Sequence, residues 1–95
     1  MIFLGTQRVV ATAVDQNVTA FTVPNGTQFV LMQADTDEVR WRMDGGVAAA
    51  ALGMRLVPGN APEEYKAEAF ERIHFVAEGA GAAINVTFGA SRLIP

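Results

Sequence analysis

The chain contains one histidine, His74, and any acid–base or nucleophilic mechanism would have to be built around it. A Ser-His-Asp triad needs a nucleophile against the imidazole and a carboxylate behind it. The sequence has no G-x-S-x-G nucleophile motif and no cysteine. One histidine without a second nitrogen ligand nearby is also a poor zinc site. We therefore predict that His74, between Ile73 and Phe75, is a structural or surface residue.

Acidic side chains gather in two further places. The first group, Asp35, Asp37 and Glu38, offers the oxygen ligands that Ca²⁺ prefers but lacks the twelve-residue EF-hand spacing, so it is interpreted as a charged turn. Asp44, before Gly45 and Gly46, is interpreted in the same way. The second group is Glu63, Glu64, Glu68 and Glu71. Nothing fixes a pair of these carboxylates in the geometry that glycoside hydrolysis needs. We predict no catalytic, metal-ligating or cofactor-binding residue, and a protein that is not an enzyme.

Charge and composition restrict the partners. The 95 residues carry a net charge of −3, which gives no basic surface for nucleic acid or for an anionic membrane. The longest uncharged stretch is far short of the roughly 20 apolar residues that cross a bilayer, and the apolar start of the chain is too short for a signal peptide. We expect neither nucleic acid nor a membrane as a partner.

Period-2 alternation predicts the elements that must position these residues. The clearest case alternates Val39, Trp41 and Met43 with charged neighbours, as in a strand with one buried face. Strands are expected at 7–13, 18–23, 27–34, 38–43, 53–57, 72–77 and 82–88. A turn at Pro24-Asn25-Gly26 predicts an antiparallel hairpin between the second and third of them. The pattern indicates an all-β fold, an antiparallel β-sandwich or small barrel of about seven to eight short strands.

Two segments are left open by the pattern. Residues 62–72 alternate like a strand, which is the favoured interpretation, but Asn60 and Pro62 could also begin a helix. Residues 47–52 form an Ala-rich connection that fits a helical turn or an irregular loop. The whole is interpreted as one β domain, 1–95, with an apolar N-terminal arm at about 1–6 and a short C-terminal tail at about 89–95.

Two groups of residues are candidates for contacts with other subunits. Trp41 is predicted to anchor the core, while Arg40 and Arg42 project from the opposite face, either toward carboxylates of a neighbouring subunit or as a solvated, salt-bridged face. The apolar N-terminal arm at about 1–6 is expected to dock on a neighbouring subunit, which would remove its apolar side chains from water. The candidate subunit-interface residues are Met1, Ile2, Phe3, Leu4, Arg40, Trp41 and Arg42.

Several of these segments together resemble a known group of proteins. The run Val39-Arg40-Trp41-Arg42-Met43-Asp44-Gly45 and three later stretches, Gly53-Met54-Arg55-Leu56, Ile73-His74-Phe75-Val76 and Ala83-Ile84-Asn85-Val86-Thr87-Phe88, carry the likeness. They resemble small bacteriophage structural proteins encoded among head and tail genes, over most of the chain from about Val18 to Phe88. The Ala-rich loop departs from the mixture of small residues and proline expected there.

The resemblance implies a virion component, and no catalytic residue comes with it. We expect a capsid decoration or cement protein, made in the host cytoplasm and located on the capsid surface. Its expected partners are the major capsid protein or other virion subunits, and further copies of itself, with a trimer as the first expectation. The alternatives are a head–tail or tail-associated protein, or a ligand- or host-surface-binding sandwich that stacks on Trp41 or Tyr65. Such a ligand-binding role requires an exposed aromatic side chain.

Overall fold

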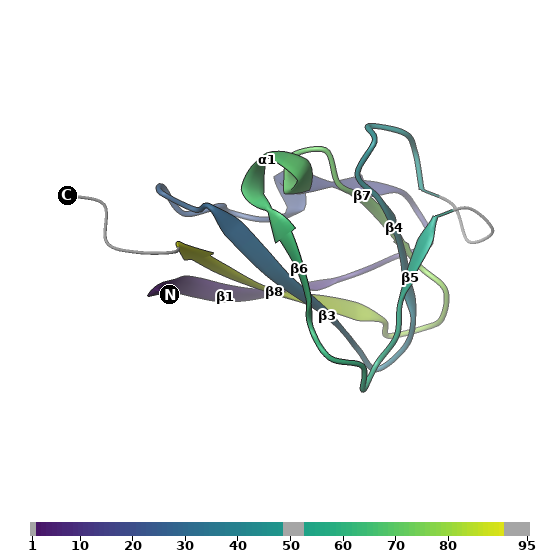
Figure 1. The fold of residues 1–95 in the computed structure, drawn as a ribbon. Coiled ribbons are helices and arrows are strands. Elements are labelled where there is room, and N and C mark those ends of the chain that lie inside the picture. Colours follow the sequence, from purple (N-terminus) through teal and green to yellow (C-terminus); the bar gives the residue numbers. More distant parts are fainter. Residues whose placement is uncertain (1, 49–52, 91–95) are drawn as a thin grey trace.

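The protein is a sandwich of two antiparallel four-stranded sheets (Figure 1). The computed structural model describes residues 2–48 and 53–90. Sheet A contains β1 (Ile2–Val10), β8 (Ala83–Ala90), β3 (Phe29–Asp35) and β6 (Glu63–Lys66), in that spatial order. Sheet B contains β2 (Gln16–Asn17), β7 (His74–Ala77), β4 (Val39–Arg42) and β5 (Met54–Leu56). The predicted all-β class is confirmed, and the described strands form a sandwich rather than a closed barrel.

The strand pairs follow a nested order. β1 pairs with β8, β2 with β7, β3 with β6 and β4 with β5. The chain therefore resembles one long hairpin folded at the β4–β5 connection, whose successive pairs are placed alternately in the two sheets. In sheet A, β3 also pairs with β8, and in sheet B, β4 also pairs with β7. These two contacts join the nested strand pairs into two four-stranded sheets. This order is that of a jelly roll, in which eight strands form two packed antiparallel sheets.

The core lies between the sheets and follows the alternation of the strands. β3 contributes Val30, Met32 and Ala34, and β8 contributes Ile84, Val86 and Phe88. From sheet B, Val39, Trp41 and Phe75 face them. Each large side chain buried in this way contributes about 1.5–3 kcal/mol. The alternation predicted for 38–43 and 82–88 is thus confirmed as an inward and an outward face.

The segment 62–72, left open between strand and helix, contains both. β6 pairs with the first half of β3, and the chain then makes one helical turn, α1 (Ala67–Phe70). The favoured strand is wrong for 67–70, because the turn carries Phe70 into the core, where it is 1% exposed. Its ring packs edge-on against Phe21 and Phe88, with centroids 5.2 and 6.0 Å away. α1 thus covers one end of the sandwich (Figure 1).

The strand predicted at 18–23 is wrong. Residues Val18–Ala20 form a 3-10 turn capped by Asn17, whose side chain accepts a hydrogen bond from the Thr19 amide at 3.0 Å. Beyond it Phe21 enters the core, and the Gln7 side chain bonds the backbone N–H and C=O of Thr22. The alternating pattern of residues 18–23 therefore belongs to a 3-10 turn followed by one buried aromatic side chain, and not to a strand.

The predicted hairpin between residues 18–23 and 27–34 is also wrong, although its turn exists. Gly26 has φ 85°, and the Thr27 amide donates to the Pro24 carbonyl at 3.3 Å. No strand precedes this turn to pair with β3, because β3 pairs instead with β6 and β8. The turn therefore leads from the core insertion at Phe21 into sheet A.

The apolar N-terminal arm predicted beyond the sheet is an edge strand. β1 begins at Ile2 and pairs with β8 from Ile2 opposite Ala90 to Val10 opposite Ala83. Pairing satisfies the backbone groups of this segment along one side, which a free arm would leave to water. The predicted tail at about 89–95 is likewise part of β8 as far as Ala90. Met1, residues 91–95 and the Ala-rich residues 49–52 lie outside the described residues.

Candidate functional site

Arg40 lies on the outer face of sheet B and forms an ion pair within its own chain. Its Nε lies 3.1 Å from Oε1 of Glu78, and both side chains are less than one fifth exposed. Arg55 on β5 reaches the other oxygen of Glu78 at 3.3 Å. Burial would raise the pKa of Glu78, but the two guanidinium charges outweigh it and hold that pKa below its ordinary value. The guanidinium of Arg40 is thus occupied by its own chain in this structure.

Arg42, two residues along the same strand, holds the loop that follows it. It donates from Nε and Nη2 to the two carboxylate oxygens of Asp44, at 3.0 and 2.6 Å, and from Nη1 to the Val47 carbonyl at 3.3 Å. Asp44 also accepts the Gly46 amide at 3.0 Å. The hydrogen bonds from Arg42 and Gly46 lower the pKa of Asp44 to about 2. This is the salt-bridged face that the sequence left as an alternative.

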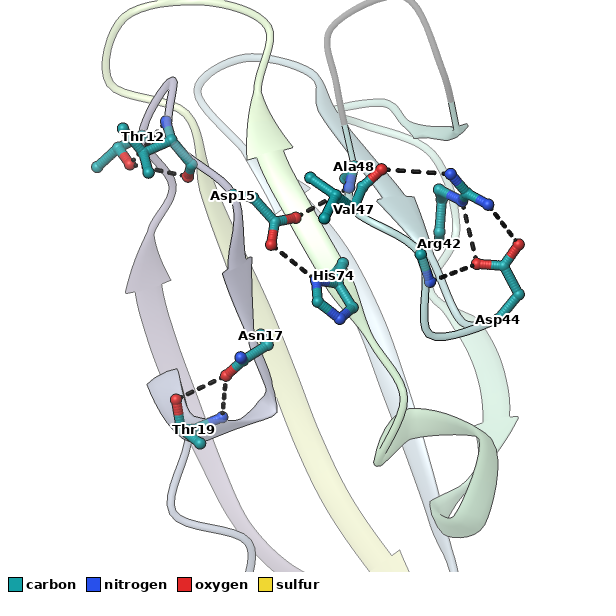
Figure 2. Close-up of polar contacts among 11 residues, drawn as sticks. Thr12, Asp15, Asn17, Thr19, Arg42, Asp44, Val47, Ala48 and His74 are labelled. Carbon is teal, nitrogen blue, oxygen red and sulfur yellow. Dashed lines mark hydrogen bonds and ion pairs between the residues drawn. The ribbon is translucent and has the colours of Figure 1, made fainter.

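His74 meets a carboxylate that sequence reasoning did not single out (Figure 2). Its Nδ1 lies 2.7 Å from Oδ2 of Asp15, and the second oxygen of Asp15 accepts the Ala48 amide at 2.9 Å. One carboxylate therefore joins the loop after β1, strand β7 and the loop after β4. Carboxylate and imidazole are two members of a triad, but within the described residues no hydroxyl contacts His74. The Asp15 carboxylate thereby holds the loop after β4 close to the loop after β1 and to strand β7.

Trp41 and Tyr65 face each other inside the sandwich. Their rings meet edge-to-face with centroids 4.9 Å apart, and Trp41 is 6% exposed, as predicted for a core anchor. The Tyr65 hydroxyl donates to Glu63 at 2.7 Å, and burial together with that carboxylate raises its pKa. Trp41 is therefore buried, and Tyr65 is partly buried against the core. Among the described residues, Phe3 is the exposed large aromatic side chain, with 59% of its surface accessible.

The acidic turn after β3 forms contacts with its own chain. Asp35 pairs with Arg8 at 3.1 Å, and Asp37 accepts the Glu38 amide at 2.7 Å. In the parts of the chain that the structure describes, no group of three or more histidine or acidic side chains is placed to hold a metal ion. No helix within those parts is long and apolar enough to cross a membrane.

The outer face of sheet A has a different character from that of sheet B. Its centre is uncharged and consists of Thr6, Leu31, Gln33, Asn85 and Thr87. At the end that extends beyond sheet B (Figure 1), Phe29 lies over Gly89, where an added β-carbon would be 2.5 Å from the Phe29 ring.

β1 forms one margin of this face. Phe3, Leu4 and Val10 are 59%, 38% and 52% exposed. Of the predicted interface residues, the structure therefore brings Ile2, Phe3 and Leu4 together on one sheet edge. It places Arg40 and Arg42 on the other sheet and Trp41 in the core.

Comparisons with known proteins give no relative from which a role could be transferred. No protein-family model, no curated protein and no solved structure matches the chain. What the structure defines is therefore the class of the protein, a jelly-roll β-sandwich, together with the surface just described.

Proposed function

We propose that this chain is a non-enzymatic structural protein of a bacteriophage virion, and specifically a capsid decoration protein that bridges capsid subunits. One observation carries the proposal: within residues 2–48 and 53–90, nothing covers the long edge strand β1 or the apolar end of sheet A. Phe3, at that end, and Val10, at the opposite end of β1, are each more than half exposed. Apolar surface of this kind on a small protein is typical of a contact with another protein.

The fold supports the proposal by analogy. Jelly rolls of two four-stranded sheets occur in viral capsid domains, although lectins and cupins share them. The resemblance of the 39–45 strand and turn to small phage structural proteins points to the first of these uses. A ligand-binding role has less support, because Trp41 is buried in the core and Tyr65 packs against it, partly buried.

The function would be mechanical. Copies docked through the β1 end would each cover a joint between subunits of the major capsid protein, and a homo-oligomer would engage several joints at once. Multiple weak contacts of this kind raise the overall affinity by effective concentration rather than by one tight site. The charged outer face of sheet B would then face solvent at the capsid surface, consistent with a net charge of −3.

The direct test uses capsids of the phage that encodes the chain, stripped of it. Adding the purified protein should restore its density on the particle and raise the temperature at which capsids rupture. Phe3→Asp should weaken rebinding at least about tenfold, because it puts a charge into an apolar contact. Val14→Asp is the matched control, since Val14 is 73% exposed outside the β1 edge. Absence of rebinding, or equal loss with both variants, would contradict the proposal.

A further inference from the structure

The turn before β3 places an asparagine directly before a glycine at the protein surface. Asn25 and Gly26 are both exposed. Gly26 has φ 85°, a conformation that glycine adopts without steric cost. The turn is closed by its outer residues, since the Thr27 amide and hydroxyl both donate to the Pro24 carbonyl, at 3.3 and 2.7 Å. The peptide between Asn25 and Gly26 therefore lies at the tip of the turn.

No hydrogen bond holds that central peptide in one orientation. Within the described part of the chain, none involves the Gly26 N–H, the Asn25 carbonyl or the Asn25 side chain. The peptide plane can therefore rotate without breaking the bonds that close the turn, and rotation brings the Gly26 nitrogen against Cγ of Asn25. Glycine has no β-carbon to hinder that approach. The turn thus allows the asparagine side chain to react with the backbone.

We propose that Asn25-Gly26 is a site of spontaneous deamidation, with water as the co-reactant. The Gly26 nitrogen attacks Cγ of Asn25, and a new C–N bond closes a succinimide ring. The bond from Cγ to the side-chain nitrogen breaks, and ammonia leaves with the proton that Gly26 gives up. Water then opens the ring. Attack at Cγ restores the backbone and leaves an aspartate, whereas attack at the backbone carbonyl carbon leaves an isoaspartate, whose main chain runs through Cβ and Cγ.

The other asparagines of the chain each lack one of these features. Asn17 accepts hydrogen bonds from the Thr19 amide and hydroxyl, at 3.0 and 2.6 Å. Asn85 lies inside β8, whose backbone is held by a strand on each side. Asn60 is exposed, but the residue after it, Ala61, carries a β-carbon beside the attacking nitrogen. Asn60 is therefore the matched comparison within the chain.

Asp44 also precedes a glycine and provides a second comparison. Gly45 has φ 81°, close to the value at Gly26. A carboxyl group closes the same ring only when it is protonated, because an ionised carboxylate resists attack by a nucleophile. The hydrogen bonds from Arg42 and Gly46 lower the pKa of Asp44 to about 2, so this carboxyl is ionised at neutral pH. We therefore expect no isoaspartate at Asp44.

Conversion changes both the charge of the protein and the path of the turn. Either product carries a carboxylate in place of a neutral amide, so the net charge goes from −3 to −4. The isoaspartate also adds a backbone carbon between Pro24 and Thr27, whose contacts close the turn. Because this turn joins the buried Phe21 to β3, the isoaspartate form should melt at a lower temperature than the fresh protein.

The test is incubation of the purified chain at mildly alkaline pH, followed by peptide mapping with mass spectrometry. Asn25 should convert at least about tenfold faster than Asn60, which corresponds to about 1.4 kcal/mol in activation free energy. The product should accept a methyl group from an isoaspartyl methyltransferase. Asn25→Gln is the control variant, because its longer side chain would have to close a larger ring, and it should form no acidic species at this position on ion exchange.

Equal rates at Asn25 and Asn60 would overturn the proposal, as would an acidic species that accumulates equally in Asn25→Gln. Thermal melting gives a second readout: the incubated wild type should melt below the fresh protein, while Asn25→Gln should not change. An unaltered melting temperature with isoaspartate present would refute the effect on the turn. The conversion is measured on the free protein and does not rest on the capsid role. If it occurs but stripped capsids bind no protein, only the proposed function fails.

Discussion

The carboxylate of Asp15 should be worth more to the fold than an exposed carboxylate of the same type. Asp15→Ala removes the contacts to His74 Nδ1 and the Ala48 amide, where the two side chains are only about one fifth exposed. A hydrogen bond to a charged group contributes about 1.5–3 kcal/mol, and partial solvent exposure lowers that value. We therefore expect a loss of about 2 kcal/mol in the free energy of unfolding. For a domain of this size, each kcal/mol lowers the melting temperature by about 4–8 °C.

The measurement is thermal and urea unfolding followed by circular dichroism, with Asp35→Ala as the control. Asp35 pairs with Arg8, and both side chains are about half exposed, so its removal should cost less than about 1 kcal/mol. Hydrogen exchange adds a local readout, because the Ala48 amide should exchange faster in Asp15→Ala and remain unchanged in the control. Equal losses from the two variants would refute the reasoning, as would an unaltered Ala48 amide.

Three further predictions concern backbone strain and ionisation. Gly53→Ala should lower stability by about 1–3 kcal/mol in urea unfolding, because Gly53 has φ 130° and a β-carbon would lie 2.9 Å from the Trp41 carbonyl oxygen. The pKa of Asp44 falls from 3.8 to about 2, so its stabilising effect is complete above pH 4 and is lost as the pH falls toward 2; the melting temperature of Asp44→Asn should depend less on pH over that range. The pKa of Tyr65 is raised, so its stabilising effect is present below pH 10 and is lost as the pH rises; phenolate absorbance should appear only with unfolding.

The strand faces were predictable from the sequence, whereas the neighbours of each strand were not. Alternation assigns Val39 and Trp41 to the core because burial of one face requires a period of two. It does not report that β4 lies between β5 and β7. The N-terminal residues were misjudged for a related reason. An edge strand that extends beyond the opposite sheet has no buried face to impose alternation, so Ile2-Phe3-Leu4 reads as an apolar tail.

The polar contacts of the site could not be predicted from the sequence, for a different reason. Asp15 and His74 are 59 residues apart, and the pair depends on where two loops and a strand meet in the folded chain. The pairing of Arg40 with Glu78 likewise requires the β4–β7 register. Residue types alone supported both possibilities stated for the arginines, a contact with another subunit or a salt-bridged face. The structure shows the salt bridges, Arg40 with Glu78 and Arg42 with Asp44, while a contact with another subunit stays a prediction.

The nested order of the strands has a consequence for the time at which the protein becomes complete. β8 is the last described strand along the chain, yet it lies inside sheet A, between β1 and β3. While the ribosome is still making that strand, β1 has no partner and sheet A cannot close. Ile2 cannot pair until Ala90, the residue opposite it in the β1–β8 ladder, has been synthesised. A topology dominated by such distant pairings folds slowly, in milliseconds to seconds. Nascent chains would therefore stay incomplete until synthesis has passed β8.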